Sequence, residues 1–334
     1  MKIESKNPLV DRFGRVHDYL RISLIEKCNL RCTYCMPEQG IPLSPKSHLM
    51  TSDEVFALAK TFVDLGVKKI RFTGGEPLLR KDFDEILRKV AELPVELAIT
   101  TNGILLDRYY DLLLELNVRS INVSLDTLDS KKFEEITRRN QFDRVMKNIE
   151  LFNNEHFDLK VNAVLMRGFN ESELVDFVEM TQHSSIAVRF IEFMPFGGNK
   201  WEEEKTVTLA DILGVMNTFY GEEKVVSHAH LPNETSKIFH IEGYQGTFGV
   251  ISSVTSPFCG DCNRMRLTAD GKMKNCLFGQ DEKNLLSALR EGQDIESLIR
   301  SSVHEKHEKH GGLSLDNENA DSLDKNRSMI LIGG

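Results

Sequence analysis

The stretch EKCNLRCTYCMP, residues 26–37, places three of the chain's six cysteines within eight positions. It follows directly on YLRISLI (19–25), an apolar and β-branched run typical of a buried strand. Cys28, Cys32 and Cys35 have the spacing C-x3-C-x2-C. Six cysteines in 334 residues are too few for a disulfide framework, so thiols this close together indicate metal or redox chemistry.

Beyond this segment, strand-like runs alternate with amphipathic helical patterns. In the first helical pattern, Thr51 and Glu54 form a capping box ahead of apolar residues at helical spacing. Six such units predict an α/β fold with a parallel sheet, which we interpret as a partial TIM-type (βα)6 barrel. An open doubly wound sheet has the same periodicity. The five further strand-like runs are KKIRFT (68–73), VELAIT (95–100), RSINVSL (119–125), LKVNAVL (159–165) and VRFIEF (188–193).

We expect three parts in the chain: an N-terminal extension (1–18), the partial barrel (19–235) and a smaller C-terminal α+β module (236–334). The pattern changes after Trp201, where a short helix (209–220) precedes β-rich segments and a second cysteine region. The last thirty residues read as a mostly polar tail. In both candidate architectures, functional groups gather at the C-terminal ends of the strands, which is where the loops GGEP, TNG and SLD occur.

Composition limits the partners. The net charge of −9 argues against non-specific nucleic-acid binding, so any polyanionic ligand needs a local cluster of Arg or Lys. No run approaches the eighteen or so apolar residues of a membrane span, and the first residues lack the apolar core of a signal peptide. We therefore expect no membrane partner and a cytoplasmic location.

The second triplet, Cys259, Cys262 and Cys276, has the spacing C-x2-C-x13-C. Structural zinc sites close with four ligands, and no His lies within or just beside either triplet. Four-iron clusters ordinarily take four thiolates, so three would leave one iron open to a small molecule. Zinc sites with distant ligands and buried thiols without a metal remain alternatives at this point.

The first triplet, with Tyr34 before its third cysteine, and the GGEP at Gly74–Pro77 resemble the radical S-adenosylmethionine superfamily. Within it, RFIEFMP, CGDCNRMRLTADGKMKNCLF and the terminal IGG resemble the GTP 3',8-cyclase family of molybdenum cofactor biosynthesis, over nearly the whole chain. The two glycines of GGEP remove side chains where backbone must approach a ligand, and the turn offers N–H and C=O groups to the methionine end of the cofactor.

The resemblance implies a radical rearrangement of GTP to (8S)-3',8-cyclo-7,8-dihydroguanosine 5'-triphosphate. It implies two [4Fe-4S] clusters, S-adenosylmethionine, and an external one-electron reductant of the flavodoxin or ferredoxin type, and it leaves room for a homodimer. It assigns the clusters to Cys28, Cys32 and Cys35 and to Cys259, Cys262 and Cys276, and S-adenosylmethionine to Tyr34, Gly75, Ser124 and Met194. It assigns GTP to Arg21, Arg71, Thr100, Lys160, Arg264 and Arg266.

Catalytic roles fall on Arg21, Arg264 and Arg266, and on the tail residues Gly333 and Gly334, which reach into the active site in that family. Arg264 and Arg266 alternate, so on a strand both point the same way, and barrel-strand cations including Arg189 could converge on one anion. Each of the assigned residues also has an interpretation without a functional role. The Arg and Lys residues could be surface cations, Thr100 could form a turn, and Ser124 could satisfy backbone at a strand end. Met194 could belong to the core, and Gly333 and Gly334 could form a mobile tail.

Two other functions use the same residues. A radical enzyme that modifies a peptide would share the first triplet and GGEP, but such enzymes often carry seven or more further cysteines in the C-terminal region. A zinc-binding scaffold is the non-catalytic alternative. His304, His307 and His310 recur at i, i+3 and could bind a metal, but the Glu and Lys between them favour a solvated helix face.

Overall fold

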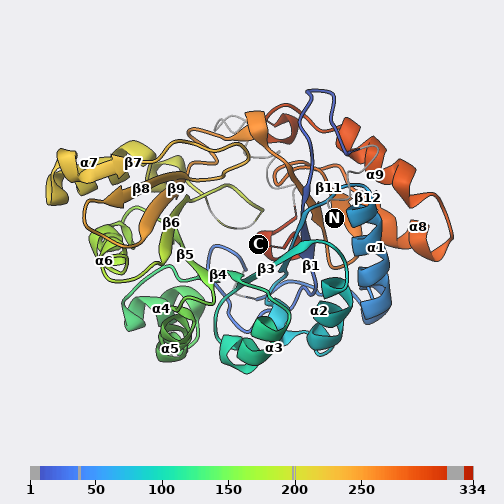
Figure 1. The fold of residues 1–334 in the computed structure, drawn as a ribbon, viewed down its shortest axis with the longest axis horizontal. Coiled ribbons are helices and arrows are strands. Elements are labelled where there is room, and N and C mark those ends of the chain that lie inside the picture. The colour runs from blue at the N-terminus through green and yellow to red at the C-terminus, as the bar shows by residue number, and fades with distance from the viewer. Residues whose placement is uncertain (1–7, 37–38, 198, 200, 314–326, 334) are drawn as a thin grey trace.

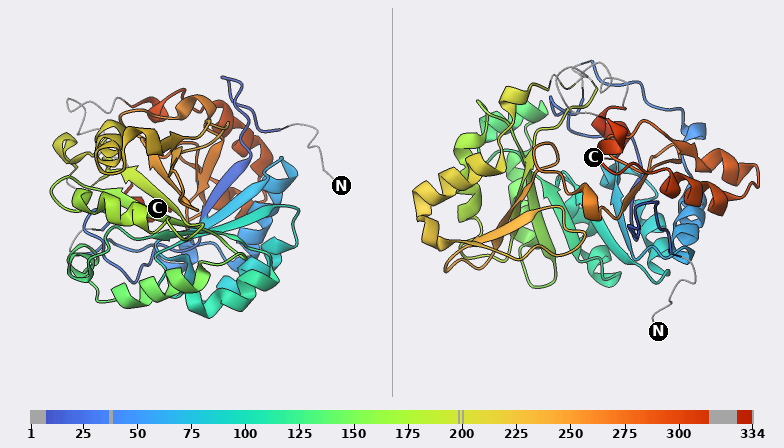
Figure 2. Two further views of the ribbon diagram at one scale, coloured as in Figure 1. Left: turned by 60° about the vertical axis from the view of Figure 1, so that its left-hand side comes forward. Right: turned by 90° about the horizontal axis from the view of Figure 1, so that it is seen from above.

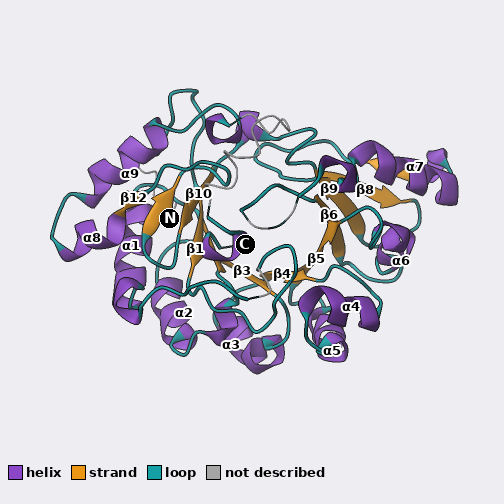
Figure 3. Ribbon diagram, turned by 180° about the vertical axis from the view of Figure 1, so that it is seen from behind, coloured by secondary structure: helices purple, strands orange, loops and turns teal. Residues whose placement is uncertain are grey.

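The computed structural model describes residues 8–36, 39–197, 199, 201–313 and 327–333. One long, strongly curved sheet dominates it, with helices on the outer, convex side (Figure 1). Seen from behind, the strands form an arc whose concave side faces the middle of the molecule (Figure 3). The concave side is where the candidate site lies.

The centre of the sheet is formed by six parallel strands in chain order, as the sequence predicted. β-branched and aromatic residues fill them, and four of the five residues of β2 are buried. Because each strand is parallel to the next, every strand ends at the same rim. The strands are β1 (Tyr19–Ser23), β2 (Lys69–Thr73), β3 (Glu96–Thr101), β4 (Ser120–Ser124), β5 (Asp158–Leu165) and β6 (Ala187–Glu192).

Later parts of the chain extend this sheet at both edges. β10 (Arg264–Leu267) pairs with β1 and β9 (Thr247–Ile251) pairs with β6, both in parallel. Figure 2 shows the strand that carries Arg264 beside the first strand of the barrel. Among the described residues the order runs from β12 to β7 without closing, so the barrel is partial. The outer strands are β7 (Val225–Ser227), β8 (Lys237–Ile241), β11 (Lys272–Lys274) and β12 (Lys283–Asn284).

The helices bury their apolar faces against the convex side of the sheet. At the start of α1, Thr51 accepts from the amide of Glu54 while Glu54 accepts from that of Thr51, which confirms the predicted capping box. The helices are α1 (Ser52–Asp64), α2 (Phe83–Ala91), α3 (Tyr110–Glu115), α4 (Ser130–Thr137), α5 (Phe142–Phe152), α6 (Leu174–Glu179), α7 (Leu209–Tyr220), α8 (Leu285–Arg290) and α9 (Ile295–His304).

The core lies between the helices and the sheet, and it is continuous from the first strand to α9. Phe62, Phe72, Phe177, Phe190 and Phe248 are fully buried within it. Burying an aromatic side chain of this size contributes roughly 1.5–3 kcal/mol. The concave side is therefore free to carry polar and charged side chains without weakening the core.

Candidate functional site

A cavity of about 720 Å³ fills the concave side of the sheet. This is within the range of small-molecule sites, roughly 300–1,000 Å³. The predicted site residues lie in its wall, apart from the two tail glycines. They are Cys28, Cys32, Cys35, Cys259, Cys262, Cys276, Tyr34, Gly75, Ser124, Met194, Arg21, Arg71, Thr100, Lys160, Arg264 and Arg266, joined by Arg189.

The GGEP loop holds the first cysteine segment in place. A Cβ on Gly75 would come within 2.5 Å of the Lys27 carbonyl oxygen, so only glycine permits this approach. The amide of Gly75 donates to Ile25 O at 2.7 Å and that of Glu76 to Lys27 O at 2.9 Å. The expectation that both amides are free for a ligand was therefore wrong. Gly75 still lines the cavity, and its contact with S-adenosylmethionine stays a prediction.

Two buried carboxyl groups that sequence reasoning missed face the first triplet. Glu76 accepts hydrogen bonds from Thr101 Oγ1 at 2.8 Å and the amide of Asn102 at 2.7 Å, yet burial raises its pKa to about 7. Asp126 accepts from Tyr34 Oη at 2.8 Å, and burial raises its pKa to about 6. Both follow a strand end, in GGEP and SLD, which was the available signal.

The thiols of the first triplet are held in their neutral form in the protein alone. Burial, and then the charge of Glu76, raise the pKa of Cys28 to about 11. Burial followed by the charge of Cys28 raises the pKa of Cys35 to about 12. Burial and then Asp126 raise the pKa of Cys32 well above its usual value. Burial is the largest cause for all three thiols, and the charges of Glu76 and Asp126 add to it at Cys28 and Cys32.

The second triplet has the opposite surroundings. Cys259 begins a single 3-10 turn (Cys259–Asp261), Cys262 directly follows it, and β10 begins two residues after Cys262. Burial would raise the pKa of the Cys262 thiol, but the charges of Arg264 and Lys306 outweigh it and lower that pKa to about 6. A thiolate is thus favoured at this site even without a metal.

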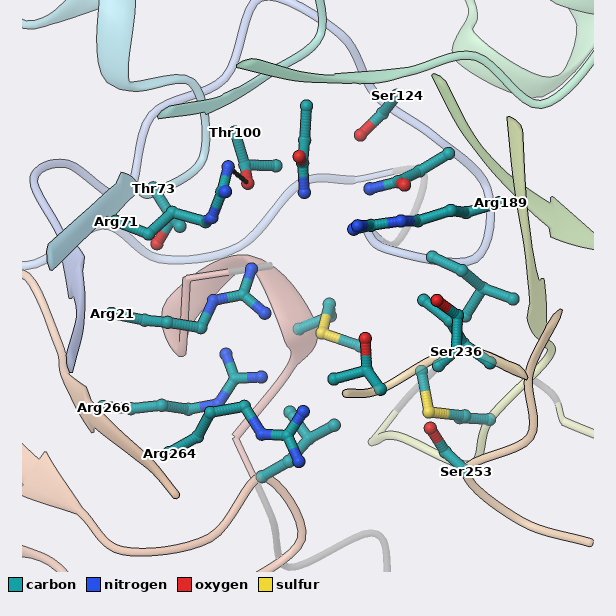
Figure 4. A pocket seen from close by; sticks show the side chains of 18 of the residues that line it. Arg21, Arg71, Thr73, Thr100, Ser124, Arg189, Ser236, Ser253, Arg264 and Arg266 are labelled. Atoms are coloured by element: carbon teal, nitrogen blue, oxygen red, sulfur yellow. Dashed lines mark hydrogen bonds between the residues drawn. The ribbon is translucent and has the colours of Figure 1, made fainter. Parts of the chain in front are cut away.

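Three arginines form one wall of the cavity beside the second triplet. In the parallel pairing of β1 with β10, Arg21 lies opposite Arg266, and Arg264 lies opposite Tyr19. Figure 4 shows the guanidinium groups of Arg21, Arg264 and Arg266 stacked along this wall and pointing into the cavity. Burial lowers the pKa of Arg21 to about 10 and that of Arg266 well below its usual value.

Neither terminal nitrogen of Arg264 has a hydrogen-bond partner among the described residues, although both are buried. Unpaired buried donors are costly, and adjacent cations repel one another. An anionic ligand on this wall would relieve both costs. The predicted convergence of strand cations on one anion therefore fits the wall.

A second group of predicted cations lies further along the sheet, and two of its members have polar partners within the protein. Arg71 donates to Tyr19 Oη at 2.7 Å, to Ile99 O at 2.6 Å and to Ser120 Oγ at 3.0 Å. Lys160 is paired with Asp158. In Figure 4, Arg71 and Arg189 reach into the cavity from opposite sides.

Part of the tail enters the cavity. Ile330 and Ile332 are buried, and Ile332 forms a small apolar cluster with Phe196 and Phe278. Arg266 donates to Ile332 O at 3.4 Å. A Cβ on Gly333 would come within 2.5 Å of Thr73 Oγ1 at the end of β2. The expectation of a polar tail was wrong for residues 327–333, and Gly334 lies outside the described residues.

The histidine-rich segment also differs from its prediction. α9 ends at His304, so the three histidines do not share a helix face. His310 is buried, its Nε2 lies 3.0 Å from Ser253 O, and its ring contacts Phe278 edge-on. The expectation of a solvated face was wrong for Lys306 and His310, which turn inward over the second triplet, whereas Glu305, Glu308 and Lys309 are exposed as expected. The His side chains do not converge on a shared metal position among the described residues.

The cysteine triplets fit iron–sulfur clusters by donor type. Thiolates are soft ligands that suit iron–sulfur clusters, and each triplet opens into the cavity. No group of three or more His, Cys, Asp or Glu converges on a single ion within the described part of the chain. A four-iron cluster is several atoms wide, so its thiolates do not need to converge on one point.

Comparison with known proteins agrees with this geometry. The pattern of the Radical SAM superfamily matches residues 22–181, and that of Molybdenum Cofactor Synthesis C matches residues 186–312. The two patterns together define a radical S-adenosylmethionine protein with a second, family-specific part.

Curated relatives identify the family. The GTP 3',8-cyclase of Listeria welshimeri serovar 6b is 40% identical over 98% of this chain and 99% of its own length. The chain therefore belongs to the GTP 3',8-cyclase family. The Molybdenum cofactor biosynthesis protein 1 of Dictyostelium discoideum is 46% identical over 99% of this chain but only 53% of its own length. The chain thus spans about half the length of the first relatives that it matches.

Solved structures support the fold. SuiB of Streptococcus suis, in a crystal structure bound to S-adenosylmethionine, aligns over 89% of this chain and 69% of its own length with a TM-score of 0.57 and 20% identity. At that identity the likeness concerns the fold alone. Across the described ranges, no helix is long and apolar enough to cross a membrane.

Proposed function

We propose that this protein is a GTP 3',8-cyclase, which rearranges GTP to (8S)-3',8-cyclo-7,8-dihydroguanosine 5'-triphosphate in the first step of molybdenum cofactor biosynthesis. One observation carries the proposal: a single cavity is lined by both cysteine triplets and by a wall of three arginines beside the second. The family relationship supports the same activity.

The charges divide the cavity between the two ligands. The first triplet, with Asp126 and Glu76, suits S-adenosylmethionine, whose sulfonium and ammonium groups are positive. The wall of Arg21, Arg264 and Arg266 suits a triphosphate, which prefers arginine donors. Two [4Fe-4S] clusters, one on each triplet, complete the proposed cofactor set.

When bound, the reduced first cluster and S-adenosylmethionine supply the radical that removes hydrogen from the GTP ribose. The chain contributes position and enclosure. Asp126 fixes Tyr34 beside the first triplet, and the Arg wall orients the triphosphate. The buried tail lines the cavity with Met329 and Ile330, and these apolar side chains would help to exclude water from the site.

An anoxic turnover assay tests the proposal. The protein, reconstituted with iron and sulfide, is incubated with S-adenosylmethionine, a one-electron reductant and GTP. We expect a brown protein with about two four-iron clusters, consumption of GTP and formation of the cyclised triphosphate. Intact GTP beside normal cleavage of S-adenosylmethionine would favour a peptide modifier, and a colourless zinc protein would favour the scaffold.

The remaining expectations on partners belong to the same proposal. A flavodoxin- or ferredoxin-type protein supplies the electron, the enzyme acts in the cytoplasm, and it forms a homodimer. Replacing dithionite by a purified flavodoxin system, and sizing the protein by light scattering, test the first and last of these.

A further inference from the structure

The segment HEKHEKH (304–310), which the sequence left without a role, covers the second cysteine triplet. Lys306 is 3% exposed, and its Nζ lies 3.5 Å from Cys262 Sγ and 2.9 Å from Arg264 O. The backbone amide of His310 is hydrogen-bonded to Cys259. Two of the three sulfurs of the triplet are thus contacted by one five-residue stretch.

The N-terminal hairpin fixes this stretch from the outside. Arg15 donates to Cys259 O at 2.7 Å, to Glu308 O at 2.8 Å and to His307 O at 2.8 Å. Its Nε is paired with Asp11 at 2.6 Å, and both side chains are buried. One guanidinium therefore joins the cysteine turn to the histidine-rich segment and holds the backbone next to Lys306 close to the second triplet.

A cation and an N–H donor beside thiolate sulfurs have a known physical effect. A cluster gains one negative charge on reduction, and nearby positive charge stabilises that form. Hydrogen bonds to the sulfurs and net charge are among the factors that set the reduction potential of iron–sulfur clusters. In a buried setting such charges are weakly screened.

We propose that Lys306 is a positioning residue for the second cluster, which acts through Cys262 to raise the reduction potential of that cluster. This inference rests on the proposed function, since it requires a cluster on Cys259, Cys262 and Cys276. The contacts of the Lys306 ammonium group are with Cys262 Sγ and Arg264 O. The first triplet is contacted by no comparable lysine among the described residues, so the effect is specific to the second cluster.

A redox titration followed by electron paramagnetic resonance tests the inference. Replacing Cys28, Cys32 and Cys35 by alanine removes the first cluster, so that only the second cluster gives a signal. In this background Lys306→Gln keeps a donor for Arg264 O but loses the charge. Lys309→Gln, an exposed residue of the same segment, is the matched control. We expect a more negative midpoint potential for Lys306→Gln and an unchanged one for Lys309→Gln.

Three results separate the possible failures. Unchanged potential in Lys306→Gln with full iron content overturns the inference and leaves the proposed function intact. Loss of second-cluster iron in both Lys306→Gln and Lys306→Arg, while thermal unfolding is normal, overturns it in favour of a purely structural lysine. Iron for only one cluster in the wild-type protein overturns the two-cluster proposal and this inference together.

Discussion

The two cysteine triplets face one cavity but lie in opposite electrostatic surroundings. Near the first, Asp126 and Glu76 are the charged neighbours, and the thiol pKa values are raised. Near the second, Arg264 and Lys306 are close enough to lower the pKa of Cys262 to about 6 despite its burial. Two triplets of the same residue type can therefore suit small molecules of opposite charge, because the residues around them differ.

This contrast explains how an acidic protein can bind a triphosphate. The net charge of −9 describes the whole chain, whereas the wall of Arg21, Arg264 and Arg266 acts locally inside a low-dielectric cavity. The acidic end, by the same reasoning, repels the phosphates. Under the proposed function, this contrast would direct each ligand to its own triplet.

Arg264→Gln should have the largest effect on the difference in charge between the surroundings of the two triplets. The terminal nitrogens of Arg264 are buried without a hydrogen-bond partner among the described residues, so they are available to an anionic ligand. We expect GTP to bind about 2–5 kcal/mol more weakly, at least roughly thirtyfold, with S-adenosylmethionine affinity unchanged. Isothermal titration under argon measures both. Arg88→Gln, which removes an exposed cation paired with Glu115, is the control and should change neither affinity.

Gly333→Ala tests the tail between the two ends. Gly333 has a φ of +80°, and its Cβ would meet Thr73 Oγ1, so the tail must shift. Displacement of about 1 Å can cost roughly a hundredfold in rate, and we expect a loss of that order in cyclisation without loss of iron. Gly243→Ala shares the positive φ but points into open space, so its turnover should be normal.

The removal of Gly333 and Gly334 extends this test. It should abolish ring closure while iron content and S-adenosylmethionine binding stay normal. A truncated enzyme with ordinary product formation would remove the role of the tail.

Asp126→Asn tests the role of the carboxylate beside the first triplet. The carboxylate accepts from Tyr34 Oη and from the amide of Val164 at 2.9 Å, so the amide loses the charge while it keeps an acceptor. Hydrogen bonds to charged groups contribute about 1.5–3 kcal/mol, so we expect S-adenosylmethionine to bind roughly tenfold more weakly or worse. Asp129→Asn, at the exposed start of α4, should leave both affinities unchanged.

His17→Gln should have the smallest effect on ligand binding and turnover at neutral pH. His17 lies in the N-terminal hairpin, whose Arg15 contacts the second triplet. Burial, and then the charge of Lys306, lower the pKa of His17 to about 4. The unfolded chain therefore binds more protons than the folded protein between about pH 6.5 and 4. Stability falls across that window as the pH drops, by up to about 3 kcal/mol from this group.

Urea unfolding of the apoprotein at pH 7.5 and 4.5 measures that loss. His17→Gln should reduce the difference between the two pH values, whereas His156→Gln on the surface should not. An equal acid loss in His17→Gln and wild type would show that the group is not held neutral.

Local patterns predicted the central part of the fold. Alternation of strand-like runs with helical spacing predicted β1 to β6, and the pair Thr51 and Glu54 marked the start of α1. Periodicity did not reveal that β10 pairs with β1, because that contact joins residues more than 240 positions apart. Long-range pairing leaves no local signal in the sequence.

The same limit applies to the site. Cysteine spacing and the alternation of Arg264 with Arg266 identified the residues that carry chemistry. The roles of Arg15 and Lys306 depend on the approach of two remote segments, and the burial of His310 depends on a chain reversal after α9. Charged residues in a Glu- and Lys-rich run resemble a solvated face until the fold buries them.

Binding of both ligands to two triple variants tests the division of the cavity most directly. One variant replaces Cys28, Cys32 and Cys35 by alanine, and the other replaces Cys259, Cys262 and Cys276. We predict that the first loses S-adenosylmethionine but binds GTP, and that the second binds S-adenosylmethionine but loses most of its GTP affinity. Loss of both ligands in one variant and of neither in the other would contradict the assignment of one ligand to each end.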